Sequence, residues 1–331
     1  MKSQFDIVFV CNDEGKDRIN EKGIDVIYSV GERRIKRVFS FLALIWAVSR
    51  KHQFSLIYIV YFRYAFVLRF LLWQKVLILD IRSAEIKNNK FKKSLLDHLL
   101  RFTAFVFPIN TIISESLAKE LRLKSGKYHV LPLGANKVDG GERSLSTPRL
   151  LYVGTLNMRS IEKTLYGFSK LLKQTSEAEY YIVGTGSLED VNRINVEIAS
   201  LGIEKHVHLL GQIPYDNLRD YFLKANIGVS YVPKMAYFEN QPPTKTFEYI
   251  LSGLPVIATS TVENQKIVSN SNGVLVEDSK VAFSEGLLAL WKIREKFSTE
   301  EVVKSCEFAT YENIVNNNFA PFLKGRIVEN S

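Results

Sequence analysis

The chain has 331 residues, of which 46% are hydrophobic and 24% are charged; these values are typical of globular proteins, and the length allows two domains. Its two cysteines, Cys11 and Cys306, belong to no CxxC or Cys/His cluster, which argues against structural zinc and a disulfide framework and favours a reducing cytoplasm. The net charge of +9 is uneven: residues 1–147 carry 25 Lys and Arg against 14 Asp and Glu, and residues 148–331 carry 19 against 21.

The N-terminal part begins with two expected strands, Phe5–Asn12 and Ile24–Val30. The first starts so close to the N-terminus that no signal peptide is expected. The glycine-rich turn of a familiar NAD site does not follow it, because Gly15 is the only glycine there. The fingerprint of an NAD-binding domain is therefore absent from this position.

Two basic, apolar helices are expected next, at Arg33–Lys51 and Phe62–Lys75, on either side of a strand at Phe54–Tyr61. The apolar run of the first helix, Val38–Val48, falls far short of the ~20 residues needed to cross a bilayer. Apolar residues nearly all round favour a buried helix, whereas basic flanks and Trp46 suit a membrane surface; we favour burial. The positive charge still makes peripheral contact with an anionic membrane an open alternative. Nucleic acid is not expected, because the aromatic residues sit among Leu and Val.

A strongly apolar strand, Val76–Ile81, carries Asp80 and Arg82 near its carboxyl end, where sites form in open α/β sheets. The pair suits either a site or a local ion pair. Further elements are expected in alternation at Ser94–Phe107, Thr111–Ser114, Glu115–Leu123 and Tyr128–Pro132. The polar stretch Lys137–Pro148, with two glycines, is the expected interdomain linker.

The C-terminal part repeats the alternation. The expected strands are Arg149–Gly154, Glu179–Val183, Val207–Leu210, Ile227–Tyr231, Leu254–Thr259 and Gly273–Val276. The expected helices are Ile161–Leu172, Ser187–Leu201, Tyr215–Leu223, Pro243–Ser252, Val281–Phe297, Thr299–Ala309 and Tyr311–Leu323. Two such series predict an α/β protein with two doubly wound, Rossmann-like domains whose parallel sheets face across a cleft.

Several strand ends of the C-terminal part carry glycine, which lets a ligand approach the backbone closely. These glycines are Gly154, Gly184, Gly186 and Gly211. Thr155 and Arg159 lie in the turn after the first of these strands, and Arg159 is an available cation. Together these residues predict a groove for a nucleotide.

The helix that begins at Pro243 is suited to phosphate binding. Thr244, Lys245 and Thr246 follow at the positive end of the helix dipole, where free N–H groups can hold an anion. Glu248 shares a helix face with Lys245 and offers a carboxylate for a ribose hydroxyl. The same residues would also suit an ordinary helix with a solvated Lys–Glu pair.

The sequence carries no P-loop and no Asp-x-Asp pair, and its five histidines show no metal-ligand spacing. We therefore expect no metal and no cofactor. A departing diphosphate would instead be stabilised by fixed cations and a helix dipole.

Four segments carry a resemblance to a known family. They are YVGTLNMRS (Tyr152–Ser160), YYIVGTGSLED (Tyr180–Asp190), VHLLGQIPYDNL (Val207–Leu218) and PPTKTFEYILSGLPVIAT (Pro242–Thr259). On these segments the chain resembles retaining glycosyltransferase family 4, among the glycosyl transferases group 1, which have the GT-B fold. The resemblance implies an acceptor-binding domain at residues 1–140, a nucleotide-sugar-binding domain at 148–310, and a helix at 311–331 that packs back on the first domain.

The resemblance also implies roles for individual residues. Lys245 and Arg159 would hold the diphosphate, and Glu248, matching the second glutamate of the family's Glu-x7-Glu motif, would hold the ribose. Gly154 and Thr155 would form a loop that approaches the donor. The base pocket would be lined by Gly184, Gly211 and Ile213, and Gly186 would belong to the same nucleotide-sugar site.

The chain departs from the family where the first motif glutamate would stand. Asn240 occupies that position, and Glu239 lies one place earlier. Contact with the donor sugar would therefore fall to Glu239, to Asn240 or to neither.

The resemblance implies a metal-independent retaining glycosyltransferase, with a nucleotide-diphosphate sugar as donor and a saccharide or lipid-linked acceptor. Synthesis of a bacterial surface polysaccharide, in the cytoplasm or on the cytoplasmic face of the membrane, is the expected setting. The alternatives are a nucleotide-sugar epimerase of the same fold and a non-catalytic nucleotide-binding subunit.

Overall fold

The computed structural model describes residues 4–13, 18–19, 22–30, 34–84, 90–138 and 143–329. The chain forms two compact units: unit 1 comprises Met1–Leu131 and Val315–Ser331, and unit 2 comprises Pro132–Ile314. The expected linker lies within unit 2, and its residues 139–142 fall outside the described ranges. Gly15 and Arg33, both used in the predictions above, also lie outside them.

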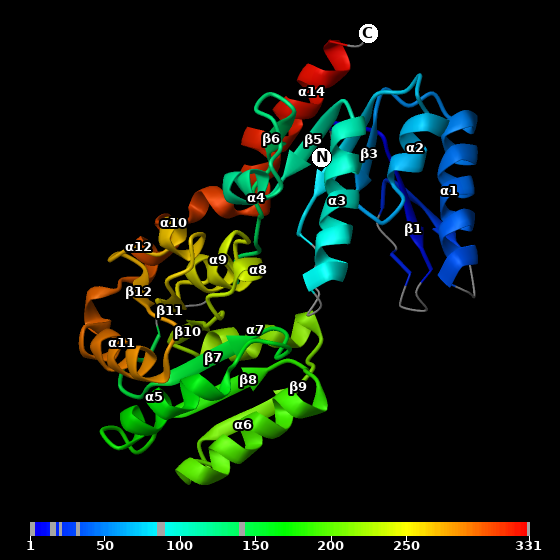
Figure 1. Ribbon diagram of the computed structural model, residues 1–331. Coiled ribbons are helices and arrows are strands. Elements are labelled where there is room, and N and C mark those ends of the chain that lie inside the picture. The colour runs from blue at the N-terminus through cyan, green and yellow to red at the C-terminus, as the bar shows by residue number, and fades with distance from the viewer. Residues whose placement is uncertain are drawn as a thin grey trace. The chain divides into compact units, whose positions relative to one another are not determined.

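Unit 1 is a parallel α/β unit (Figure 1). Its strands are β1 (Ile7–Asn12), β2 (Ile24–Ser29), β3 (Ile57–Val60), β4 (Leu77–Ile81), β5 (Ile109–Ile112) and β6 (Tyr128–Val130). Its helices are α1 (Arg34–Lys51), α2 (Phe66–Leu71), α3 (Lys90–Val106) and α4 (Glu115–Glu120), with η3 (Val315–Phe319) and α14 (Ala320–Val328) at the end of the chain. β1 pairs with β2, and the other four strands form a parallel sheet in the order β3-β4-β5-β6.

β4 forms the centre of unit 1, because all five of its residues are buried. Asp80 belongs to this strand. It accepts a hydrogen bond from the Thr111 hydroxyl (2.6 Å) and forms an ion pair with Arg82 (2.5 Å). The structure thus pairs the Asp80 and Arg82 side chains within unit 1 and satisfies the buried carboxylate locally, as such burial requires.

The first two helices differ from their expected form. α1 buries Leu42 and Val48 but exposes Phe39 and Trp46, so it is not surrounded by protein. α2 is shorter than the predicted Phe62–Lys75, because its first turn begins only at Phe66. Among the described helices, none combines the length and apolar composition needed to cross a membrane.

Unit 2 is the larger α/β unit. Its strands are β7 (Arg149–Val153), β8 (Glu179–Val183), β9 (Val207–Gly211), β10 (Ile227–Ser230), β11 (Val256–Thr259) and β12 (Gly273–Val276). The helices among them are α5 (Glu162–Leu172), α6 (Leu188–Leu201), α7 (Tyr215–Lys224), α8 (Ala236–Glu239), α9 (Thr244–Leu251), α10 (Asn264–Ile267) and α11 (Lys280–Lys292). Short helices end the unit: η1 (Arg294–Lys296), α12 (Thr299–Lys304), η2 (Glu307–Ala309) and α13 (Tyr311–Ile314).

The six strands of unit 2 are parallel and lie in the order β12-β11-β10-β7-β8-β9 (Figure 1). The chain therefore builds the sheet outward from β7 in one direction and then returns to β10 to build it in the other. Large side chains fill the core on both faces, and the buried tyrosines keep hydrogen-bond partners, as buried hydroxyls must. The Tyr152 hydroxyl donates to the carbonyl of Thr155 (2.6 Å), and that of Tyr249 accepts from the amide of Val153 (2.7 Å).

The predicted helix at Tyr311–Leu323 is divided in the structure. α13 ends at Ile314, a π-helical segment follows as η3, and α14 continues from Ala320. The division coincides with the passage of the chain from unit 2 to unit 1. Such a wide turn is a recognised interruption of α-helices.

Candidate functional site

The strand order of unit 2 indicates where a ligand would bind. In an open parallel sheet, ligands lie beyond the carboxyl ends of the strands, where the order of strands reverses. In this sheet the reversal lies between β7 and β10. The residues predicted to bind the donor lie at or just after the ends of β7, β8 and β9, at the end of α8, or in α9.

Glycines allow the loops after β7, β8 and β9 to pack against one another. The Gly154 amide donates to the carbonyl of Val183 (2.9 Å), and the Gly184 amide donates to that of Gly211 (2.7 Å). Gly154 and Gly184 have φ angles of +142° and +149°, which L side chains rarely adopt. A Cβ atom on Gly184 would lie 1.8 Å from the Gly154 carbonyl oxygen. Alanine therefore cannot replace Gly184 without moving the β7 loop.

Gly186, two residues after Gly184 in the loop after β8, also permits close packing against the β7 loop. A Cβ atom there would lie 2.8 Å from the Cβ of Leu156. Thr155 is exposed, and its hydroxyl accepts a hydrogen bond from the amide of Asn157 (3.2 Å), which fixes the shape of the loop. Ile213 follows β9 and is partly buried against the core of unit 2. The residues predicted around the base thus lie in the loop after β8 and at the end of β9, which the hydrogen bond from Gly184 to Gly211 joins.

α9 begins at Thr244, after Pro243, and ends before Gly253, whose φ angle is +76°. Phe247 and Ile250 bury one side of the helix. Its first amides have no partner within the helix, as at the start of any α-helix. Pro243 thus places the Thr244 and Lys245 amides, and the Lys245 side chain, at the carboxyl end of the sheet.

The Lys245 ammonium group is enclosed. Its Nζ atom lies 3.7 Å from the ring centroid of Tyr152, a cation–π contact, and it has no hydrogen-bond partner among the described residues. It also lies 3.2 Å from the place that a Cβ of Gly154 would occupy. Burial lowers the pKa of Lys245 well below its usual range, the charge of Arg159 lowers it further, and Glu248 opposes the shift.

Arg159 is held in a strained loop. Its neighbours Met158 and Ser160 have φ angles of +55° and +50°, which are uncommon for residues other than glycine. Its guanidinium lies 4.0 Å from the ring centroid of Phe238. Burial raises the pKa of Tyr152, and the charge of Arg159 opposes that shift. Arg159 and Lys245 therefore both interact with Tyr152. Strained backbone such as that beside Arg159 is often found at functional sites.

Glu248 lies on the same face of α9 as Lys245. Burial raises the pKa of Glu248, and the nearby charge of Lys245 opposes the shift. The structure therefore brings together Gly154, Arg159, Lys245 and Glu248 at the end of β7.

The other predicted residues lie in different surroundings. The Glu239 carboxylate accepts a hydrogen bond from the amide of Val262 (3.0 Å), and Asn240 ends α8. The Thr246 side chain is fully buried, with its hydroxyl bonded to Ser230 (2.6 Å) and to Asn264 (3.0 Å). The Thr246 side chain thus holds α9 to the sheet.

Two aromatic residues of this region were missed by sequence reasoning. Tyr152 precedes the glycine of the β7 loop and could have been suspected from that position. Phe238 is buried in a four-residue helix that the sequence pattern did not indicate. Within the described part of the chain, no three His, Cys, Asp or Glu side chains gather as a metal site would require.

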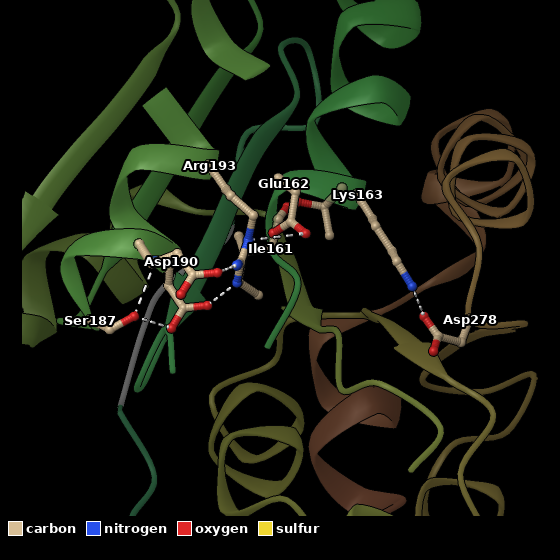
Figure 2. A network of polar contacts seen from close by, with 9 residues as sticks. Ile161, Glu162, Lys163, Ser187, Asp190, Arg193 and Asp278 are labelled. Atoms are coloured by element: carbon tan, nitrogen blue, oxygen red, sulfur yellow. Dashed lines mark hydrogen bonds and ion pairs between the residues drawn. The ribbon is translucent and has the colours of Figure 1, made fainter. Parts of the chain in front are cut away.

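A network of polar contacts supports the loops behind the glycines. Figure 2 shows Arg193 of α6 reaching Asp190 on its own helix and Glu162 (4.0 Å) on α5. Lys163 of α5 forms an ion pair with Asp278 (2.8 Å), which follows β12. Although burial alone would raise the pKa of Asp278, hydrogen bonds from Lys163, Tyr231 and the Lys234 amide lower it. These contacts tie α5 to both α6 and the end of β12.

The comparison with family models matches part of the chain. Residues 147–292 match the family described as glycosyl transferases group 1. This part of the chain is therefore similar to a glycosyltransferase domain. The match begins just before β7 and ends with α11, so the whole region of Gly154, Arg159, Lys245 and Glu248 lies within it. No curated protein sequence matches the chain significantly.

Several solved structures share the fold of this chain. Sucrose-phosphate synthase from Thermosynechococcus elongatus is 16% identical with a TM-score of 0.73, over 94% of this chain and 86% of that one. HepE from Anabaena, solved with UDP and glucose, is 12% identical with a TM-score of 0.70, over 91% and 86%. A glycosyltransferase from Rickettsia africae is 15% identical with a TM-score of 0.70, over 93% and 86%. The predicted GT-B fold is thereby confirmed.

Proposed function

We propose that the protein transfers a sugar from a nucleoside-diphosphate sugar to a saccharide or lipid-linked acceptor, with retention of configuration and without a metal ion. The observation that carries the proposal is the enclosed Lys245 ammonium beside Arg159. A buried cation without a paired anion lowers the stability of a protein unless a ligand supplies the opposite charge. A diphosphate at the carboxyl end of β7 would supply it.

Each described residue would then have a part in binding the donor. Arg159, Lys245 and the first amides of α9, at Thr244, would bind the diphosphate, and Glu248 would accept a hydrogen bond from the ribose. The loops with Gly184, Gly186 and Gly211, with Ile213, would border the base. UDP is the nucleotide favoured by comparison, since Anabaena HepE was solved with UDP and glucose. Glu239 and Asn240 are the proposed contacts to the donor sugar.

The proposed reaction exchanges one bond at the anomeric carbon of the donor. The acceptor hydroxyl attacks from the face that the diphosphate leaves, and the bond from that carbon to the β-phosphate oxygen breaks. The diphosphate takes the proton of the hydroxyl. Arg159 and Lys245 stabilise the charge that develops on the departing oxygen, which is the step at which fixed cations accelerate a reaction most.

The proposed setting is the synthesis of a bacterial surface polysaccharide on the cytoplasmic side of the membrane. Cys11 and Cys306 are free thiols, which suits a reducing compartment. The excess of basic residues lies in the N-terminal part, which would serve an acceptor held at an anionic membrane.

A thermal-shift panel of nucleotide sugars tests the donor site, because a bound ligand raises the melting temperature. Lys245→Met should melt at or above the temperature of the wild type without ligand, since it removes an unpaired buried charge, and should lose the ligand-induced shift. Glu248→Gln should weaken the shift. The exposed Lys205 of unit 2 supplies the matched control, and Lys205→Met should keep the shift. A full shift in both Lys245→Met and Glu248→Gln would disprove this donor site.

Incubation with the preferred nucleotide sugar alone tests the class of reaction. A transferase should leave the sugar unepimerised and release free nucleotide diphosphate in step with product once acceptor is added. Epimerisation without acceptor would replace the proposal with an epimerase, and binding without turnover on any acceptor would indicate a nucleotide-binding subunit.

A further inference from the structure

A large groove lies on unit 1, between α1, α2 and α3. Its volume is about 1330 Å³. α1 packs against α2, and α2 packs against α3, so that the three helices form one continuous face (Figure 1). Except for Arg63 and Lys92, the side chains that line the groove are aliphatic or aromatic. The proposed transfer reaction, as assigned to unit 2, uses none of them.

The apolar side chains of this face are exposed to an unusual degree. Phe39 is 68% exposed, and Trp46, about two helical turns further along α1, is 40% exposed. Phe70 and Trp73 project from α2 and the turn after it, 61% and 68% exposed. Monomeric soluble proteins seldom leave a continuous apolar surface of this kind uncovered, so such a surface indicates a binding partner.

α3 extends the same face with a regular stripe. Phe91, Leu95, Phe102 and Phe105 follow one another at spacings of four, seven and three residues, which places them on one side of an α-helix. All four are exposed. Phe102 also meets Phe66 of α2 edge to face, with ring centroids 5.6 Å apart, so the stripe continues onto α2.

The charges around the face have one sign. Residues 34–75 contain eight Lys and Arg and no Asp or Glu. The single acid of α3, Asp97, is buried and forms an ion pair with Lys93 (2.7 Å). Arg50 stacks on Trp46, with its guanidinium 5.1 Å from the ring. The partner must therefore offer both apolar groups and negative charge.

We propose that the face formed by α1, α2 and α3 docks on an anionic lipid bilayer. The exposed aromatic residues enter the boundary between headgroups and acyl chains, and the cations bind the lipid phosphates, as in other interfacial helices. A second copy of the chain fits less well, because two such faces would bring sixteen cations of residues 34–75 together with no acids among them. The inference rests on the proposed function only for the reason why the protein would dock, which is to bring the enzyme to an acceptor at the membrane.

Flotation with vesicles tests the proposal. The full chain should float with vesicles of phosphatidylcholine that contain phosphatidylglycerol, and should remain in the dense fraction with phosphatidylcholine alone or at high salt. Arg63→Glu with Lys92→Glu should lower the partition coefficient roughly 30-fold or more, since each basic residue near such a surface contributes about a fivefold factor. The control Lys173→Glu with Lys205→Glu makes the same change of charge at exposed positions of unit 2 and should float normally.

Tryptophan fluorescence distinguishes this face from other surfaces. Trp46 lines the groove, Trp73 is exposed in the turn after α2, and the third tryptophan, Trp291, is buried in unit 2. Brominated lipids should quench the wild-type fluorescence but not that of Trp46→Phe with Trp73→Phe. The proposal would be overturned by equal quenching in both proteins or by equal flotation of the two charge variants. A dimer that Arg63→Glu disrupts would also overturn it. The donor-induced thermal shift is measured without lipid, so the failure of either proposal would be visible separately.

Discussion

Lys245 is kept in surroundings that disfavour its charge as long as no ligand is bound. Burial and Arg159 both lower the pKa of Lys245, and the aromatic ring of Tyr152 with the Glu248 carboxylate offsets only part of the effect. The free protein thus stores an unfavourable interaction that an anionic ligand removes. A site of this kind gains selectivity for anions because a neutral ligand leaves the Lys245 ammonium and the Arg159 guanidinium uncompensated.

Donor binding should therefore depend on pH through Lys245. A bound diphosphate favours the charged ammonium, so the pKa of Lys245 in the complex must be higher than in the free protein. Affinity should be greatest below the pKa of the free protein and should fall as the pH rises above it, with proton uptake on binding in that range. Titration calorimetry in buffers of different ionisation enthalpy measures the uptake.

Lys245→Arg separates this effect from other titrations, because a guanidinium remains protonated throughout the range. The variant should lose the proton uptake even if its affinity is lower. Proton uptake of the same size in Lys245→Arg and in the wild type would assign it to another group.

At the scale of elements, Arg143 joins two helices of unit 2. Its guanidinium donates to the carbonyl of Phe222 and, at 2.8 Å, to that of Ala225, both at the end of α7. It also donates to the carbonyl of Ser252 at the end of α9. Carbonyls at helix ends have no partner within the helix, and a cation there also interacts favourably with the helix dipole. Burial lowers the pKa of Arg143 to about 10, so it stays charged at neutral pH. Arg143 thus anchors the far end of the helix that carries Lys245.

Arg143→Ala should lower the free energy of unfolding of unit 2 by about 2 kcal/mol, because it leaves partly buried carbonyls without donors. Arg143→Lys should recover only a fraction, since one ammonium cannot span both helix ends. Denaturant unfolding followed by circular dichroism measures the change. Arg219→Ala, at an exposed arginine of α7, is the control and should change the free energy by less than about 0.5 kcal/mol.

The alternation of strands and helices in unit 2 could be predicted from local pattern alone. Gly154, Gly184 and Gly211 follow apolar runs, and Ser187 caps α6 as its sequence position suggests. Packing between distant segments could not be predicted in this way. The burial of Thr246 depends on Ser230 and Asn264, which reach it only in the folded sheet.

The same limit applies to the candidate site and to unit 1. Lys245 and Glu248 were indicated by their places in a helix, whereas the ring of Phe238 under Arg159 depends on tertiary packing. The exposure of Phe39 and Trp46 was likewise hidden in a run of residues that is apolar nearly all round. Sequence pattern gives the apolar character of a helix but not the number of neighbours that cover it.

At the scale of the whole molecule, the end of the chain belongs to unit 1. Phe322 of α14 stacks on His129, with ring centroids 4.3 Å apart, and the Asn318 Oδ1 atom accepts a hydrogen bond from Nε2 of the same imidazole (2.8 Å). Leu323 is buried on this helix, whereas Val328 is exposed on it. α14 is therefore a packed element of the smaller unit.

Leu323→Ala should lower the free energy of unfolding of unit 1 by about 3 kcal/mol, as expected for a leucine removed from a packed interior. Val328→Ala on the same helix should have almost no effect. In the background of Trp291→Phe, the remaining tryptophans Trp46 and Trp73 both report on unit 1 during denaturant unfolding. Equal loss of stability in the two variants would show that α14 does not support this unit.

The return of the chain to unit 1 has a consequence for synthesis on the ribosome. Unit 2 is continuous in sequence, whereas unit 1 needs residues 315–331, which follow every residue of unit 2. Domains tend to fold as their residues emerge, so unit 2 can be complete while unit 1 still lacks residues 315–331. In that interval unit 1 lacks η3 and α14. We expect chaperones that bind exposed aromatic residues to bind this unit at that stage.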